Sequence, residues 1–351
     1  MLSDICGKMK FGYVNVSVDP LTAIELGEFA EKSGFHTLWL PDHFVDVDGD
    51  KVEPWTVLSA LAMKTRKIRL ASSVTDTQRS HPARTAHAVA CLDVISHGRA
   101  VLGIGAGEAM NIIPFGLPWD SPRERVVRLA EAIQVIRSLW KSTRENPTSF
   151  TGTYYSLKNA FLSQQPHQTY PPIYVGAFAS TRALAVVGQF GDGWHSWINT
   201  PETFRRSWTI VENAAKSAGR DAEKIDSTTH LMLANPRNSE EKKLALLAGK
   251  ATLLMEKNVL KSLGYSAELE QYQHLMVLKQ DVARVMAVAE QIPDELVYRT
   301  MAIGGTDEIT EKIRWLAKSG VKHLAVADLL APKTAKRTLT LVSRIMKKHR
   351  H

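Results

Sequence analysis

The chain has 351 residues, 44% of them hydrophobic and 23% charged, and this length allows one large barrel or two smaller domains. No apolar run approaches the roughly 18–20 residues that cross a bilayer, and the start lacks the apolar segment of a signal peptide. Two cysteines, Cys6 and Cys91, are too few for a disulfide framework. We therefore expect a cytoplasmic protein without a membrane span. The net charge of +8 is spread along the chain without the mixture of basic and aromatic residues typical of a nucleic-acid groove, so we expect a small-molecule partner and no nucleic acid.

The first part of the chain alternates short apolar runs, rich in β-branched residues, with stretches of helical apolar spacing. Among the predicted helices, "PLTAIELGEFAEKSG" ends at a glycine and "PRERVVRLAEAIQVIRSLW" is the longest. The strands of this part are predicted at 10–18, 37–43, 68–76 and 100–107.

This alternation is interrupted once and then resumes. The stretch "SFTGTYYSLKNAFL" (149–162) is typical of a hairpin, with Gly152 at its turn. Residues 236–300 are rich in helix-forming residues and contain no clear strand before "YRTMAIGG". The strands of this part are predicted at 171–178, 193–198, 227–235 and 321–330.

About eight strands with helical crossovers are typical of a single α/β TIM barrel, the (β/α)8 fold of about 250 residues plus insertions. A doubly wound open sheet is the alternative, but it usually has fewer strands and divides into two halves. We expect one domain over 1–351, with an N-terminal extension at about 1–8, a hairpin-like insertion at 141–170 and a helical insertion at 236–300.

Catalytic side chains are expected at the carboxyl ends of the strands, where such barrels place their active sites. His43, which follows Asp42, can exchange protons near neutral pH or donate a hydrogen bond to a substrate carbonyl. An isolated Asp-His pair favours a loop role, but a place at the barrel mouth beside Glu108 favours catalysis. Glu108 has two interpretations: a carboxylate at a helix N-terminus, or a carboxyl group walled by apolar residues that acts as an acid.

Three glycines alternate in "GIGAG" (103–107), directly before Glu108. Glycines let the backbone approach a ligand closely and present amides to an anion. The spacing Gly-x-Gly-x-Gly is not a dinucleotide fingerprint, and taken alone it favours tight packing at the barrel rim.

The other histidines show no spacing typical of metal ligands, so we expect no metal site. His195 lies in a predicted strand beside two tryptophans and is expected either to line the barrel mouth or to pack in the core. Trp55, close to the loop after the second strand, is the tryptophan expected at the site.

Six stretches together resemble the luciferase-like flavin and deazaflavin oxidoreductases, in order and in spacing, from about residue 10 to 330. They are "LWLPDHF", "IRLASSVTD", "GRAVLGIGAGEAMN", "AEAIQVIRSLW", "FTGTYYSLKNA" and "PPIYVGAF". The resemblance is strongest with the branch that uses the deazaflavin coenzyme F420. Within it, "VEPWTVLSALA", "VTDTQRSHPA" and "SLKNAFL" look most like the phthiodiolone ketoreductase.

The resemblance implies that the deazaflavin lies across the strand ends, with a cis peptide bond between Ser73 and Val74 behind its ring. It also implies that His43 and Glu108 lie on either side of the reacting carbon as the catalytic pair. The implied cofactor contacts are Asp42, Ser73, Val74, Thr75, Gly107, Glu108, Asn111, Gly176, Ala177 and Phe178. The substrate pocket is expected to include Tyr13, Trp55, His195 and Arg299.

Departures from the family pattern lower the weight of two substrates. The sugar-phosphate dehydrogenase of this branch has a tryptophan shortly after its histidine, where this chain reads "FVDVD". The lysines that hold its substrate phosphate have no evident counterpart here, although Arg299 matches its arginine. The methylene-tetrahydromethanopterin reductase has a glutamate in its first strand, where this chain has Tyr13 and Asn15, and an aspartate in place of Glu108.

The expected function is therefore an F420-dependent oxidoreductase, which transfers a hydride between deazaflavin C5 and a small-molecule carbonyl, alcohol or C=N group. The alternative is a luciferase-like monooxygenase that uses reduced FMN. A third hypothesis, a non-catalytic barrel that carries a flavin, is disfavoured by the complete set Asp42, His43, Ser73 and Glu108. The resemblance also implies a homodimer.

Overall fold

Eight parallel strands pair side by side and close into a ring, which confirms the predicted (β/α)8 barrel. The computed structural model describes residues 9–46, 49–254, 257–265 and 279–348. The last strand, β14, pairs with the first, β1, with Lys10 opposite His323. In ring order the strands are β1 (Lys10–Val14), β2 (Thr37–Leu40), β5 (Arg69–Ser72), β7 (Ala100–Gly105), β10 (Ile173–Gly176), β11 (Gly193–Ile198), β12 (Asp226–Ala234) and β14 (His323–Asp328).

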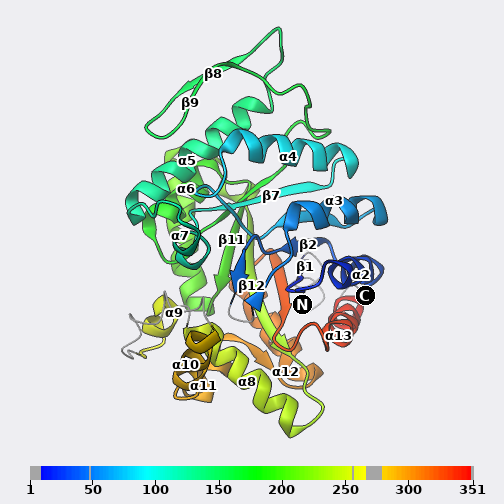
Figure 1. Cartoon of the computed structure of the whole chain (residues 1–351). Coiled ribbons are helices and arrows are strands. Elements are labelled where there is room, and N and C mark those ends of the chain that lie inside the picture. The colour runs from blue at the N-terminus through cyan, green and yellow to red at the C-terminus, as the bar shows by residue number, and fades with distance from the viewer. Residues whose placement is uncertain (1–8, 47–48, 255–256, 266–278, 349–351) are drawn as a thin grey trace.

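A helix accompanies each barrel strand and covers the outside of the ring (Figure 1). Proline at the first turn of α2, α3, α4, α5 and α7 suits the helix start, and the preceding side chain accepts a hydrogen bond from a free backbone N–H. These caps explain why the helices begin where they do. The helices are α2 (Pro20–Lys32), α3 (Pro54–Lys64), α4 (Pro82–Ile95), α5 (Pro122–Leu139), α6 (Thr181–Phe190), α7 (Pro201–Ser217), α12 (Thr306–Lys318) and α13 (Ala335–Lys348).

Alternation along each strand divides the apolar side chains between two cores. In β1, Phe11 and Tyr13 belong to the core between the ring and its helices. Val14 belongs to the second core, which continues from the ring interior to the helices of the late insertion. Gly12 faces the interior, where a side chain would collide with the Trp39 indole, so glycine makes room for this tryptophan.

Two insertions extend beyond the ring (Figure 1). The strands β8 (Thr148–Thr151) and β9 (Ser156–Ala160) pair as an antiparallel hairpin, within the range 141–170. After β12 the chain forms α8 (Ser239–Leu254), α9 (Lys257–Ser262), α10 (Lys279–Ala289) and α11 (Asp294–Thr300), followed by β13 (Ala302–Ile303), which pairs with β12. The extension predicted at 1–8 lies outside the described residues.

Two predicted strands differ from the observed ones. The strand predicted over 68–76 is divided into β5 and β6 (Thr75–Asp76), and the peptide bond between Ser73 and Val74, which lie between them, is cis. In "YRTMAIGG", residues 298–300 complete α11 and only Ala302–Ile303 are extended. Here helix packing of Val297 and Thr300, which are buried, outweighs the β-branched composition.

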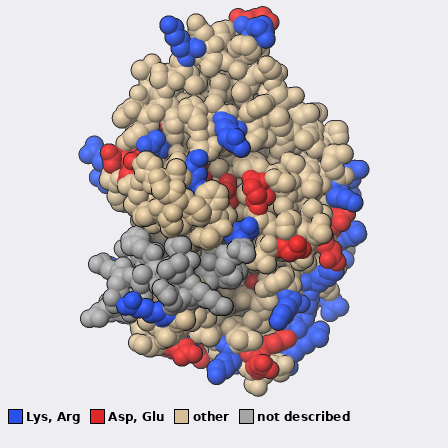
Figure 2. All heavy atoms as spheres, in the orientation of Figure 1, with Lys and Arg blue, Asp and Glu red and all other residues tan. Residues whose placement is uncertain are grey.

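Charged residues are spread over the surface, as the sequence indicates. Figure 2 shows lysines and arginines distributed among acidic residues on the face that it presents. Within the described ranges, no helix is both long and apolar enough to cross a membrane.

Candidate active site

A cavity of about 900 Å³ opens at the carboxyl ends of the barrel strands. Residues after β2, β5, β7 and β10 line one part of it, and β11, β12, β14 and the inserted helices α8 and α10 line another. Its size lies near the upper end of the roughly 300–1,000 Å³ typical of ligand pockets. The strand ends named by the sequence therefore meet at one large cavity.

The segment Ser73–Val74 forms part of the cavity wall, and three glycines pack behind it. A Cβ atom at Gly105 or Gly176 would lie 2.6 or 2.8 Å from Val74 Cγ2, and one at Gly103 would lie 2.0 Å from the Ser72 carbonyl oxygen. At Gly103 and Gly105 the glycines thus serve tight packing within the protein. Only Gly107 in this motif has a positive φ, 88°, which side chains rarely adopt.

Asp42 lies in a largely buried ionic network in the wall of the cavity. Thr75 Oγ1 donates to Asp42 Oδ2 at 2.6 Å, and Arg79 Nη2 donates to Asp42 Oδ1 at 2.9 Å. Arg79 Nε also donates to Asp76, which accepts the backbone N–H groups of Gln78 and Arg79 at 2.8 Å each. Burial raises the pKa of Asp42, against the lowering effect of Arg79 and Thr75. One guanidinium group therefore holds two carboxylates in place.

His43 and Glu108, the pair that the resemblance assigns to catalysis, both line the cavity and approach each other. The His43 Nε2 and Glu108 Oε2 atoms lie 3.4 Å apart. The His43 side chain is 18% exposed, whereas that of Glu108 is 55% exposed. Glu108 is therefore not walled by apolar residues, and its side chain does not cap the short helix that follows it. The pair joins an enclosed imidazole to a carboxylate in contact with solvent.

Asn111 fixes the loop that carries His43. Its Oδ1 atom accepts the backbone N–H groups of Phe44 at 2.6 Å and Val45 at 3.0 Å. The Asn111 side chain is buried, and its Nδ2 has no hydrogen-bond partner among the described residues. Because Asn111 also lines the cavity, this amide is available to a ligand there.

A chain of side-chain contacts leads from Ser73 through two buried histidines, His195 and His230, into the barrel. Ser73 Oγ lies 2.9 Å from His195 Nε2, which lies 2.9 Å from His230 Nε2. One of the two Nε2 atoms must therefore carry a hydrogen and the other must accept it. Burial lowers the pKa of His195 well below its ordinary value, with a further contribution from His230, and lowers that of His230 to about 3. Both rings are neutral at pH 7.

The buried histidines predict a loss of stability in mild acid. Because the pKa values of His195 and His230 are lowered in the folded state, the unfolded chain binds more protons below its histidine pKa of about 6.5. We expect the free energy of unfolding to decrease as the pH falls below about 6.5, by up to about 1.4 kcal/mol per pH unit for each such group. Urea unfolding at about pH 7.5, 6.5 and 5.5 measures this slope.

The variant His230→Asn tests this assignment. It removes one titrating ring, so its unfolding free energy should depend less steeply on pH than that of the wild type. His87→Ala is the matched control, because His87 is exposed on α4, and it should keep the wild-type slope. An unchanged slope in His230→Asn would contradict the neutral, buried pair.

The structure brings most of the expected site residues together. The lining includes His195 and, among the expected catalytic and cofactor contacts, Asp42, His43, Ser73, Val74, Gly107, Glu108, Asn111, Gly176, Ala177 and Phe178. Thr75 does not line the cavity but supports Asp42 from behind.

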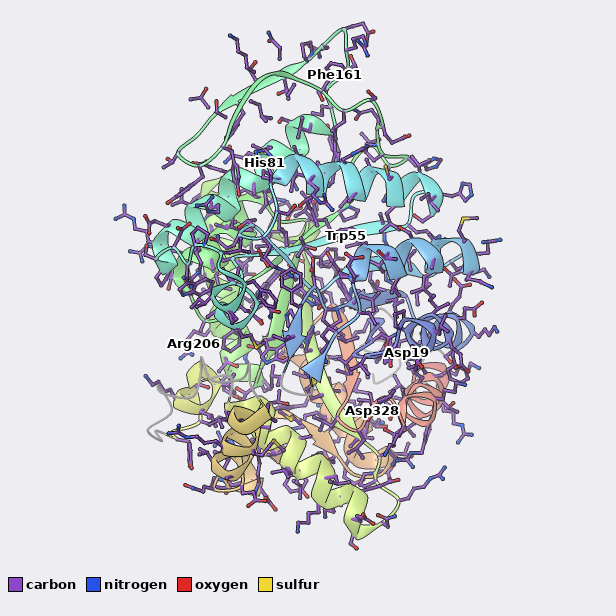
Figure 3. The ribbon with its side chains drawn as sticks, viewed as in Figure 1. Asp19, Trp55, His81, Phe161, Arg206 and Asp328 are labelled. Atoms are coloured by element: carbon purple, nitrogen blue, oxygen red, sulfur yellow. The ribbon has the colours of Figure 1, made fainter. Side chains whose placement is uncertain are left out.

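Three residues expected in the substrate pocket lie elsewhere. Tyr13 is fully buried between the ring and its helices, where it packs against Phe35, because odd positions of β1 face outward. Trp55 lies in the first turn of α3 and packs on the same outer core (Figure 3). Arg299 is exposed at the end of α11. None of the three lines the cavity.

The sequence argument missed Arg79 and His230, and it gave no role to Asp76. Asp76 and Arg79 stand three residues apart just after a strand, and this spacing of opposite charges is a usable signal. His230 belongs to "STTHLMLAN", where a polar residue interrupts an otherwise apolar run. A buried polar residue in a strand is informative because it requires a partner.

Comparison with known proteins shows which proteins the chain is similar to. The model of the family described as luciferase-like monooxygenase matches residues 11–323. An F420-dependent glucose-6-phosphate dehydrogenase from Microbacterium testaceum is 31% identical over 331 residues, which cover 91% of each chain. A phthiodiolone/phenolphthiodiolone dimycocerosates ketoreductase from Mycobacterium tuberculosis is 28% identical over 379 residues, with 96% of each chain covered.

A solved structure has the same fold. The coenzyme F420-dependent tetrahydromethanopterin reductase from Methanopyrus kandleri superposes with a TM-score of 0.83, at 24% identity, over 98% of this chain and 100% of that one. The family match spans most of the barrel, from β1 to the start of β14. The chain belongs to the luciferase-like monooxygenase family.

Proposed function

We propose that the protein is an oxidoreductase that uses coenzyme F420 to reduce a small-molecule carbonyl or C=N group, or to oxidise the corresponding alcohol. The observation that carries this proposal is the His43–Glu108 pair at the cavity mouth, with Nε2 and Oε2 at 3.4 Å. Relatives along the whole chain are named as F420-dependent enzymes, and this supports the choice of coenzyme.

The residues at the cavity fit a deazaflavin with a phosphate-bearing tail. Asn111 Nδ2 is a buried donor without a partner in the described part of the chain, at the edge of the cavity. Gly107, with its positive φ, keeps the backbone there free of a side chain. Asp42 and the Ser73–Val74 segment would hold the ring, and backbone amides near Gly107 and Gly176–Phe178 would hold the phosphate.

The side chains supply proton transfer and orientation. Reduced F420, when bound, supplies the hydride that the substrate carbon accepts. His43 gives a proton to the substrate oxygen, and in the opposite direction it takes the proton of the alcohol. Glu108 is 55% exposed, so it exchanges protons with water and returns one to His43. Asn111 keeps His43 in place through its two bonds to the loop.

Direct titration tests the choice of coenzyme. We expect saturable F420 binding, followed by fluorescence, at least about tenfold tighter than FMN binding, a difference of about 1.4 kcal/mol. Asn111→Leu should weaken F420 binding by about tenfold, since it removes a donor and loosens the loop. The matched control, Asn146→Leu, lies on an exposed loop and should bind normally. Tighter FMN binding with oxygen consumption would favour the monooxygenase, and binding of neither would overturn the proposal.

A further inference from the structure

The cavity has two chemically different parts. The first part carries the charged groups that line it from the loops after β2, β5 and β7: Asp42, His43, Lys51, Asp76 and Glu108. Arg125, at the start of α5, adds a cation on the same half of the ring. This polar part contains His43 and Glu108, to which the proposed proton transfer is assigned.

The second part is an apolar wall. Its apolar residues are Val16, Trp197, Met232, Ala251, Val282 and Met286, which come from the ends of β1, β11 and β12 and from the inserted helices α8 and α10. The uncharged polar residues Ser196 and Thr252 and the buried His230 line the cavity from the same elements. The inserted helices and the barrel thus build this wall jointly. Ala251 is 5% exposed and belongs to the core shared by the ring and the insertion.

Asp328 is the single Asp, Glu, Lys or Arg that the described part of the chain places on this side, at the end of β14 (Figure 3). Its Oδ1 accepts the backbone N–H of Leu330 at 2.9 Å, and its Oδ2 accepts from Thr334 Oγ1 at 2.6 Å. Asp328 is only 4% exposed, and both of its carboxylate oxygens accept hydrogen bonds from the loop that follows β14. Among the described residues, no lysine or arginine faces a ligand from the apolar wall.

We propose that the substrate is an uncharged ketone or secondary alcohol with a hydrocarbon substituent, which lies against the apolar wall while its oxygen meets His43. This inference rests on the proposed function and goes beyond it by naming the substrate class. A phosphate or carboxylate on the substituent would lose its water without gaining a lysine or arginine partner from the described residues of the wall, and such desolvation is unfavourable. Hydrocarbon groups gain free energy with each methylene that leaves water.

Binding to the F420-loaded protein tests the substrate class without requiring turnover. Calorimetry with methyl ketones from butanone to nonanone should show a dissociation constant that falls about fourfold per added methylene, until the wall is covered. Pyruvate and glucose 6-phosphate serve as charged comparators. We expect both to bind at least about a hundredfold more weakly than heptanone.

Ala251→Phe tests where the substituent lies. The larger side chain occupies space at the wall, so it should weaken nonanone binding by about tenfold or more and leave butanone binding nearly unchanged. Leu244→Phe is the matched control, because Leu244 lies on the same helix α8 and is 52% exposed. Ala248→Leu, one turn earlier on α8 and also on the cavity lining, provides a second variant if Ala251→Phe does not fold.

The outcomes separate this inference from the proposed function. Affinity that does not change with chain length, preference for the charged comparators, or no ketone binding at millimolar concentration would overturn the substrate class even where F420 binds. Failure of F420 to bind in its own titration would overturn the proposed function. In that case, the affinities of the ketone series, measured on the protein without F420, would still test whether the apolar wall binds a hydrocarbon substituent.

Discussion

His43→Ala is expected to lower the rate of ketone reduction by about 10²–10⁴-fold while F420 binding changes little. The physical reason is the loss of the proton donor at the substrate oxygen, and a positioned general acid contributes a factor of this size. His43 lines the cavity and is 18% exposed, so its truncation leaves no cavity in the core. Stopped-flow oxidation of reduced F420 in the presence of the best-bound ketone measures the rate.

Two further variants make the His43 result specific. Glu108→Gln keeps the size of the side chain but removes the carboxylate, so it should slow turnover less than His43→Ala and alter the pH profile. His87→Ala, on the exposed face of α4, should turn over at the wild-type rate. If His43→Ala kept more than half of the wild-type rate, or lost F420 binding in proportion to its rate, the assignment of His43 as proton donor would be wrong.

Arg79→Met is expected to have the largest effect on stability. It removes the cation between Asp42 and Asp76 and leaves two buried carboxylates without their counter-ion. Breaking a buried ion pair from one side costs about 3–5 kcal/mol, because the remaining charge stays out of water. Urea unfolding at neutral pH measures the change in the free energy of unfolding, and F420 titration measures the accompanying loss of affinity.

An exposed arginine provides the comparison. Arg205 lies 3.7 Å from Glu202 on α7, and their side chains are 59% and 70% exposed. Arg205→Met should change the unfolding free energy by no more than about 0.5 kcal/mol, since surface pairs contribute little. Equal effects of the two substitutions would mean that the Asp42 network does not hold the site together.

The contrast between Gly103 and Gly107 shows where local sequence stops being informative. Both belong to one motif, which taken alone favours tight packing, and the resemblance assigns only Gly107 to the cofactor. The packing of Gly103 against Ser72 and of Gly105 against Val74 is a contact between neighbouring strands, which no spacing within the motif reveals. Gly105 and Gly107 both line the cavity, but of the motif's three glycines only Gly107 lies beyond the end of β7.

The three misplaced pocket residues have a related explanation. Tyr13 and Val14 are neighbours on β1, and alternation says only that they face opposite sides. Which side is the ring interior depends on how the strand is registered against β2 and β14. Trp55 follows a loop that ends in a capped helix, and the helix carries its side chain to the outer core.

The amino-acid sequence by itself determined the barrel, its eight strand and helix units, and the strand ends where Asp42, His43, Ser73 and Glu108 stand, because periodicity, caps and turn residues act over a few positions. Only the tertiary structure decided that Arg79 joins two carboxylates, that His195 meets His230, and that the inserted helices give the cavity an apolar wall. Apart from Arg79 with Asp76, these contacts join segments far apart in the chain. They follow from strand register, ring closure and the docking of the insertion, which the order of residues does not express locally.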